Sequence, residues 1–259
     1  MNQKPHTVLE VCVDSYASAM AAVRGGADRL ELCSALALGG LTPWTELLAQ
    51  IRAVSDITIR CLMRPRAGDF LYSQEEIDLL CAQIKALHQA GANGFVIGAL
   101  QADGELDTRS TARLCEAADG AGLTLHRAID VSRDPLRTYR DAAALGIDTV
   151  LTSGAAANCL AGRETIGKLL ALRDEIGGPE ILIGAGVNAA VITELRRDFP
   201  AARAFHMSGK TEVESAMQFR RQDVPMGLPG LDEWHLQYTS EKYVRAARLA
   251  LDASFSAQN

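Results

Sequence analysis

Short runs of β-branched and other apolar residues alternate along this chain with longer stretches whose apolar residues recur at helical spacing. Each run is separated from the next by a segment rich in alanine, leucine and charged residues. The pattern predicts eight strands with helices between them. The strands are expected at residues 8–13, 29–33, 57–63, 94–97, 123–129, 149–152, 181–184 and 203–207.

Eight successive βα units predict a closed barrel of parallel strands. Right-handed βα units repeated in one chain close into a (β/α)8 TIM barrel, which typically takes about 250 residues, and this chain has 259. We therefore expect one domain over residues 1–259. The alternative is an open doubly wound sheet, which normally carries a Gly-x-Gly-x-x-Gly turn after its first strand; this chain reads Val13-Asp14-Ser15-Tyr16 there.

The last part of the chain departs from this rhythm. Prolines and glycines, among them Pro225 and Pro229, interrupt the sequence after the eighth predicted strand. We expect a long loop over about 208–238, followed by a C-terminal helix over about 240–256. Loops at the C-terminal end of a barrel often cover the site.

Composition narrows the class of protein. Hydrophobic residues make up 48% and charged residues 22%, which is ordinary for a globular protein and excludes long disorder. The 26 basic and 32 acidic side chains leave a net charge of −6, so no nucleic-acid partner is expected. No apolar run approaches the ~18 to 20 residues that span a bilayer, and residues 1–6 lack the apolar stretch of a signal peptide. We expect a cytoplasmic protein with no membrane partner.

Strand alternation predicts which side chains line the barrel interior, because the apolar face of each strand should meet the helices. By this rule Glu10 and Cys12 point inward from the first strand, and Glu31 and Cys33 repeat the arrangement on the second. Buried carboxylates are costly unless paired, so the glutamates predict Arg or His partners nearby. The other polar residues expected inside are Arg60, His126 and His206.

Cys12 and Cys33 form the first candidate site, for a metal ion. Neighbouring strands would bring the two thiols together, and thiolates with imidazoles suit Cu(I) or Zn(II). The alternative is that both cysteines are small buried hydrophobes, as cysteines often are. The four remaining cysteines, at positions 61, 81, 115 and 159, are expected to be inert.

Glycine-rich turns after the last three predicted strands form the second candidate, a pocket for a phosphorylated or other anionic ligand. In barrels the loops after strands 7 and 8 often bind phosphate, because glycines expose backbone N–H groups. The alternative is that these glycines serve only tight turns. The residues concerned are Ser153, Gly154, Gly184, Gly186, Ser208 and Lys210.

Arg64 and Arg66 flank a rigid proline after the third predicted strand and, together with Asp69, form the third candidate, for ligand binding. Two guanidinium groups placed there could hold a carboxylate or phosphate bidentately. Otherwise they are solvated loop charges paired with Asp69.

Acid–base catalysis is the fourth candidate, since proximity inside a barrel could bring carboxyl and imidazole pKa values toward neutrality. The groups available are Glu10, Glu31, His126 and His206. An ion-pair network that only fills the barrel is the alternative. A Schiff-base aldolase is not expected, because none of the five lysines lies on a predicted strand.

Several long motifs, in this order along the chain, resemble the CutC family, which is named for copper homeostasis. The similarity extends from about residue 8 to about residue 220. The motifs are Leu9-Glu10-Val11-Cys12, Gly26-Ala27-Asp28-Arg29-Leu30-Glu31-Leu32-Cys33, Gly39-Gly40-Leu41-Thr42-Pro43, Arg64-Pro65-Arg66-Ala67-Gly68-Asp69-Phe70, His126-Arg127-Ala128-Ile129-Asp130, Leu151-Thr152-Ser153-Gly154 and Gly184-Ala185-Gly186-Val187.

The resemblance implies a cytoplasmic TIM barrel that forms a homo-oligomer, a dimer or a tetramer. It also implies a link to copper tolerance, with Cu(I) bound by cysteines in the positions of Cys12 and Cys33, but no particular reaction. Two departures from the family pattern are visible. Trp44 replaces a usual serine, and His-Met-Ser-Gly-Lys at 206–210 replaces His-x-Ser-Ala-Arg while keeping a histidine, a serine and a cation.

Two hypotheses about function therefore stand side by side. The chain is a copper-handling protein that binds Cu(I) at the barrel mouth, or an enzyme for a small phosphorylated or otherwise anionic metabolite with an indirect link to copper. A purely structural or interaction protein is the third possibility. The sequence alone does not choose between them or decide whether the chain is an enzyme.

Overall fold

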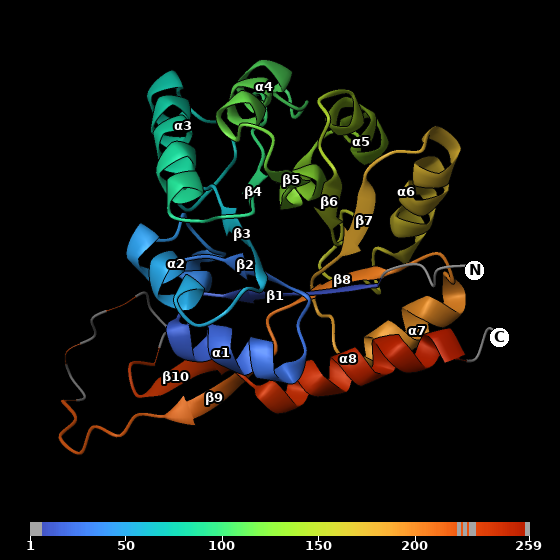
Figure 1. Cartoon of the computed structure of the whole chain (residues 1–259). Helices are drawn as coiled ribbons and strands as arrows, with labels where there is room; N and C mark the ends of the chain where they lie inside the picture. The colour runs from blue at the N-terminus through green and yellow to red at the C-terminus, as the bar shows by residue number, and fades with distance from the viewer. Residues whose placement is uncertain (1–6, 222–223, 225–226, 228–231, 257–259) are drawn as a thin grey trace.

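Eight parallel strands close a barrel in which each strand pairs with the next and the eighth pairs with the first (Figure 1). The structure is a computed structural model that describes residues 7–221, 224, 227 and 232–256. The predicted (β/α)8 TIM barrel is confirmed. Its strands are β1 (Val8–Val13), β2 (Arg29–Leu32), β3 (Thr58–Leu62), β4 (Gly94–Ile97), β5 (Gly122–Leu125), β6 (Thr149–Thr152), β7 (Glu180–Ile183) and β8 (Ala204–Met207).

Helices follow the strands and cover the outside of the barrel (Figure 1). Local sequence sets their ends: Ser73 and Glu76 form a capping box at the start of α3, and Gly26 ends α1 in the left-handed conformation, with φ 90°. The α-helices are α1 (Tyr16–Gly25), α2 (Thr45–Arg52), α3 (Gln74–Gln89), α4 (Thr108–Ala117), α5 (Pro135–Ala144), α6 (Arg163–Ile176), α7 (Ala189–Asp198) and α8 (Glu241–Ser256), with short 3-10 helices η1 (Leu36–Leu38) and η2 (Arg127–Val131).

Strand alternation places the side chains as expected. Leu9 and Val11 of β1 belong to the large core between strands and helices, and Cys61 of β3 joins them there. Cys12 and Cys33 instead lie in a separate small cluster inside the barrel. Among the described helices, none combines the length and the apolar character that a bilayer crossing needs.

The prediction for the fifth strand was too long. It was expected to continue to residue 129, but β5 ends at Leu125 and η2 begins at Arg127. His126 ends the strand because its own ring nitrogen Nδ1 accepts the backbone N–H of Ala128, which turns the chain.

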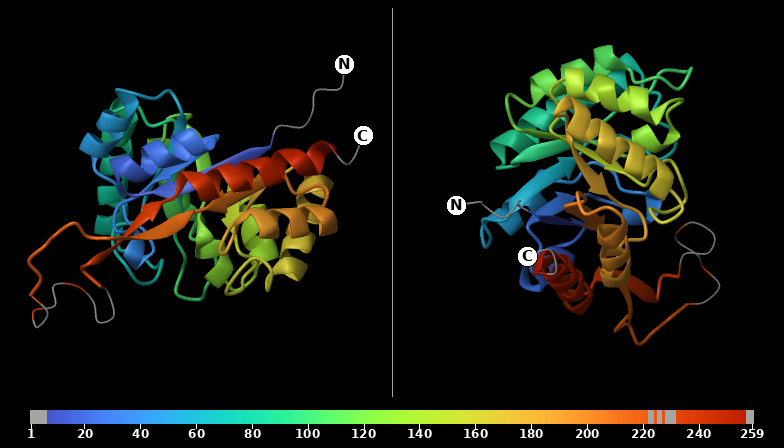
Figure 2. Two further views of the ribbon diagram at one scale, coloured as in Figure 1. Left: turned by 90° about the horizontal axis from the view of Figure 1, so that it is seen from below. Right: turned by 90° about the vertical axis from the view of Figure 1, so that its right-hand side faces the viewer.

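The long loop expected over about 208–238 has a strand near each end. This segment contains β9 (Lys210–Glu214) and β10 (His235–Thr239), which pair antiparallel with Val213 opposite Leu236. Both stretches alternate polar and apolar residues, and the prolines between them obscured that pattern. We call residues 210–239 the arm; its described parts project beyond the barrel (Figure 2). The expected loop also included residues 222–223, 225–226 and 228–231, which lie outside the described residues.

Candidate functional site

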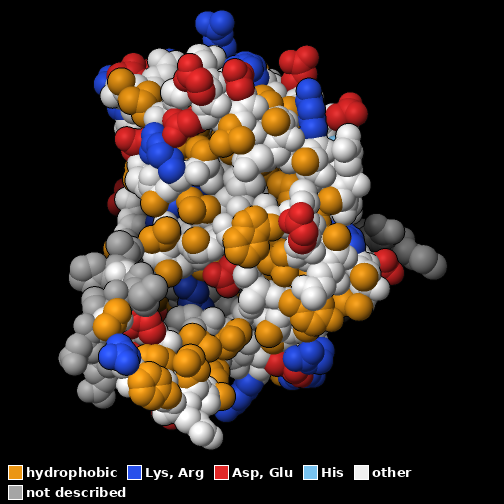
Figure 3. All heavy atoms as spheres, turned by 90° about the vertical axis from the view of Figure 1, so that its left-hand side faces the viewer, with side chains coloured by type: hydrophobic (Ala, Val, Ile, Leu, Met, Phe, Trp, Pro, Cys, Tyr) orange, Lys and Arg blue, Asp and Glu red, His pale blue; other side chains and the backbone are white. Residues whose placement is uncertain are grey.

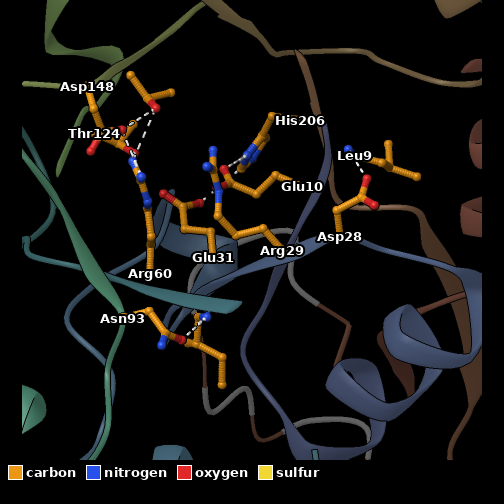
Figure 4. Close-up of polar contacts among 12 residues, drawn as sticks. Leu9, Glu10, Asp28, Arg29, Glu31, Arg60, Asn93, Thr124, Asp148 and His206 are labelled. Carbon is orange, nitrogen blue, oxygen red and sulfur yellow. Dashed lines mark hydrogen bonds and ion pairs between the residues drawn. The ribbon is translucent and has the colours of Figure 1, made fainter. Parts of the chain in front are cut away.

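Glu10 of β1 lies at the centre of a buried ion-pair cluster inside the barrel (Figure 4). Strand pairing places it level with Arg29 on β2 and with His206 on β8. Its side chain is fully buried; Oε2 accepts from Nε of Arg29, and Oε1 accepts from Nδ1 of His206 at 2.8 Å. The Arg and His partners expected for a buried glutamate are therefore present.

Charge pairing dominates the protonation of this cluster. Burial alone would raise the pKa of Glu10, but Arg29 and His206 overcome it and lower that pKa to about 2. Burial also works against a charged His206, yet the neighbouring Cys12 sulfur and the two glutamates raise its pKa above the usual range. At neutral pH Glu10 is a carboxylate that holds the Nδ1–H of His206.

Cys12 and Glu31 form a second layer above Glu10 and Arg29, toward the C-terminal ends of the strands, and the ring of His206 contacts both layers. Cys12 pairs with Glu31 in the β1–β2 register, and Nε2 of His206 lies 3.7 Å from Oε2 of Glu31. One ligand atom from each of the three residues falls within 4.8 Å of the others. Burial raises the pKa of Glu31 to about 7. A thiol, an imidazole and a carboxyl group thus converge where a metal ion could be held.

Cys33, the other expected metal ligand, is outside this three-residue set. It packs beside Cys12 with Leu62 and Val96, is fully buried, and directs its Sγ toward the Glu31 carbonyl oxygen at 3.8 Å. Burial raises the pKa of its thiol well above the usual range. Without a bound cation Cys33 is a neutral thiol beside the site.

Arg60 is inside the barrel, as expected, but it points away from the glutamates (Figure 4). Its guanidinium binds Thr124 Oγ1 at 2.7 Å and Asp148 Oδ1 at 2.7 Å. Glycines at 94 and 122 leave room for it, since a Cβ at Gly122 would lie 2.7 Å from Nη2 of Arg60. The cation that pairs with Glu10 is Arg29, which sequence analysis missed although it shares the inward face of Glu31.

A cavity of about 510 Å³ opens at the C-terminal mouth of the barrel. Figure 3 looks at the end of the molecule where the arm lies, and it shows a hollow with basic and acidic side chains inside. The cavity brings together many of the residues singled out from the sequence. They are Cys12, Glu31, Arg64, His126, Gly186, His206, Ser208 and Lys210.

Five of the nine residues expected to contact the ligand are not in the cavity wall: Arg66, Asp69, Ser153, Gly154 and Gly184. Arg66 bonds to Asp69 at 3.0 Å and to Glu76 at 2.6 Å, in an exposed cluster on the loop after β3. A Cβ at Gly184 would lie 2.7 Å from Leu151, so this glycine serves close packing. The pair Arg64 and Arg66 therefore does not act as one clamp on the cavity.

Asp130 occupies the turn that was expected to hold a ligand anion after β6. Its carboxylate accepts from the backbone N–H of Ser153 at 2.9 Å, from the Ser153 hydroxyl at 2.9 Å and from the Ala155 N–H at 3.1 Å. The Gly154 N–H donates to Thr152 Oγ1 instead. Asp130 is not among the site residues predicted from the sequence, although it closes the motif that begins at His126.

His126 lies in the cavity wall with one nitrogen free. Because Nδ1 accepts the Ala128 N–H at 3.2 Å, the neutral ring carries its proton on Nε2. Burial, with Arg64 nearby, lowers the pKa of His126 to about 3, so the ring is neutral at physiological pH. Nε2 has no hydrogen-bond partner within the part of the chain that the structure describes.

Comparison with known proteins agrees with the sequence motifs. The model of the CutC family matches residues 7–211. A CutC family protein from Chromobacterium violaceum is 40% identical over 246 residues, covering 95% of this chain and 98% of that protein, and one from Vibrio cholerae serotype O1 is 38% identical over 95% of this chain and 96% of that protein. The crystal structure of CutC from Streptococcus agalactiae has a TM-score of 0.73 at 23% identity, over 78% of this chain and 98% of that one. This chain belongs to the CutC family.

Proposed function

We propose that this protein serves copper homeostasis by binding Cu(I) at the barrel mouth, with Cys12 and His206 as ligands and Cys33 as a second thiol beside them. Membership of the CutC family implies the link to copper, because the CutC protein of Streptococcus agalactiae is described as a copper homeostasis protein. The observation that carries the proposal is the hydrogen bond from Nδ1 of His206 to Glu10.

That hydrogen bond gives His206 the arrangement of a metal-binding histidine. Histidines that bind metals usually donate their other ring N–H to a carboxylate, which fixes the tautomer and orients the ring. Here the bond to Glu10 turns Nε2 toward Cys12 and Glu31, and a bound Cu(I) would displace the proton that this nitrogen carries. A thiolate and an imidazole are ligands that Cu(I) accepts readily, whereas a carboxylate suits harder ions.

Replacing the ligand sulfur should remove most of the affinity. We expect Cys12→Ser to weaken Cu(I) binding by about 100-fold or more, because loss of an outer hydrogen-bond partner alone costs about 10- to 100-fold. Cys33→Ser should have a smaller effect, since Cys33 is not one of the three converging residues. The measurement is an anaerobic titration of the reduced protein against a competing Cu(I) chelator.

Cys81→Ser is the matched control. Cys81 is a free cysteine on α3 that directs its sulfur toward the Arg113 carbonyl, and it lies outside the mouth cavity. Its loss should leave the affinity unchanged. Equal Cu(I) affinity in the wild type and in Cys12→Ser would contradict the proposal.

We also propose a cytoplasmic setting and a homodimer built on the arm. The six cysteines are free thiols, as expected in a reducing compartment. Val213, Met217 and Phe219 expose 44%, 58% and 69% of their surfaces on the arm, and a second copy would cover them. Phe219→Ser should shift the mass measured by light scattering toward that of the monomer, whereas the matched surface change Val54→Ser should not. A monomeric wild type would contradict the dimer.

The rival hypothesis, an enzyme for a phosphorylated metabolite, gains less support from the geometry. Asp130 uses the donors after β6, and Arg66 with Asp69 lies outside the cavity. Gly186, Ser208 and Lys210 still line the mouth. A small ligand is favoured instead by Arg64 and His126, which line the same cavity.

A further inference from the structure

Arg64 is a buried cation without a counter-ion among the described residues. Only 9% of its surface is exposed, and its terminal nitrogens donate to the carbonyl oxygens of Leu38, Gly40 and Gly68 at 3.0, 3.1 and 2.8 Å. Among the described residues it makes no ion pair, and its Nε has no hydrogen-bond partner. A buried charge is costly unless an opposite charge compensates it. The charge of Arg64 is therefore uncompensated within the described part of the chain.

A second free donor lies in the same wall. The Arg64 guanidinium stands 5.3 Å from the centre of the Phe70 ring, and that ring lies 4.7 Å from the ring of His126. The Nε2–H of His126 has no acceptor among the described residues. A buried donor that lacks an acceptor loses the free energy of a hydrogen bond, so both free donors favour a ligand oxygen.

The rest of the cavity suits a small molecule with one charged end. Lys210 at the rim forms no ion pair within the described part of the chain, whereas Arg127 is paired with Asp130. Apolar side chains form much of the remaining wall, and the volume of about 510 Å³ is in the usual range of small-molecule sites. The apolar lining residues include Leu36, Leu62, Phe70, Leu151 and Val187.

We propose that the mouth cavity binds a small organic carboxylate, whose oxygens accept the free N–H groups of Arg64 and His126 while its apolar part packs against the leucine side chains. A carboxylate fits better than a phosphate, because the free donors are few and the donors of the turn after β6 already hold Asp130. The neutral state of His126 keeps Nε2 a donor. The proposal needs no metal ion and is independent of Cu(I) binding.

The test uses the full chain, freed of metal by a chelator, with acetate, butyrate and hexanoate as probes and hexanamide as the neutral match to hexanoate. Calorimetric titration at constant ionic strength should show saturable binding that strengthens with chain length. Hexanoate should bind about tenfold or more tightly than hexanamide, since only the acid meets the charge of Arg64.

Variants separate the named donors from the rest of the cavity. Arg64→Met and His126→Phe should each weaken hexanoate binding about tenfold or more. Arg66→Met is the matched control, because Arg66 stands on the same loop but pairs with Asp69 and Glu76 outside the cavity, and it should leave binding unchanged. If Arg64→Met fails to fold, Lys210→Met at the exposed rim should still weaken binding several-fold.

Three outcomes would overturn the carboxylate site: no saturable binding of any of the three acids, equal binding of hexanoate and hexanamide, or the same loss in Arg66→Met as in His126→Phe. Stronger binding of inorganic phosphate than of hexanoate would also reject it. Because the protein is metal-free in every arm, these outcomes are separate from success or failure of the Cu(I) titration.

Discussion

Glu10→Gln is expected to lower the free energy of unfolding by about 3–5 kcal/mol, measured by chemical denaturation at pH 7. Glu10 is fully buried and is the carboxylate that both Arg29 and His206 contact. The amide removes the negative charge but leaves both cations in place, and an uncompensated buried charge is strongly destabilising. The same change should weaken Cu(I) binding about 10- to 100-fold, because the amide no longer orients His206 as a carboxylate does.

Glu164→Gln is the matched control for this substitution. Glu164 pairs with Lys168 at 2.7 Å on α6, where the two side chains are 82% and 57% exposed. An exposed pair of this kind contributes little to stability, so the control should leave the free energy of unfolding nearly unchanged. Similar losses in the two variants would contradict the buried ion-pair cluster.

Acidification should destabilise the wild type relative to His126→Asn by about 3 kcal/mol between pH 7 and pH 4. The pKa of His126 is about 3 in the folded protein, against about 6.5 in an unfolded chain. Between these values the unfolded state binds the proton and the folded state does not. The stability from a neutral His126 is therefore fully present above about pH 6.5 and is lost as the pH falls toward 3. Asparagine does not titrate, so its contribution is constant.

The measurement is chemical denaturation of both proteins at several pH values. The quantity compared is the slope of the free energy of unfolding against pH. His88→Asn, at a half-buried histidine of α3, controls for replacing a histidine elsewhere in the chain. Parallel stability profiles of the wild type and His126→Asn would show that His126 is not kept neutral by burial.

The barrel could be predicted from the sequence because its signals are local. Each βα unit carries its own apolar run and helical stretch, and strand alternation alone separated Cys12 and Cys33 from Cys61. Alternation would also have given Arg29, two residues before Glu31. The predicted ends of strands were less accurate where a side chain replaced a backbone hydrogen bond, as His126 does after β5.

Other parts of the site depend on contacts between residues distant in sequence. Asp130 accepts hydrogen bonds from Ser153, which lies 23 positions later. The spacing of apolar and polar residues along the chain does not predict that contact. The arm was missed for the same reason, since β9 and β10 are stabilised by each other and not by the barrel pattern. The free donors of Arg64 and His126 emerge only when every other partner is known.

The arm also forms part of the wall of a second cavity beside Cys12. This cavity of about 440 Å³ lies between the arm and the barrel, and it shares Cys12, Leu36 and Lys210 with the mouth cavity. The match to the family model ends at residue 211, just where β9 begins. Cys12 thus lines both cavities, and part of the wall of the second comes from a segment that does not pair with β1 to β8. Exchange of the arm would therefore change the shape of the second cavity and leave the pairing of the eight barrel strands intact.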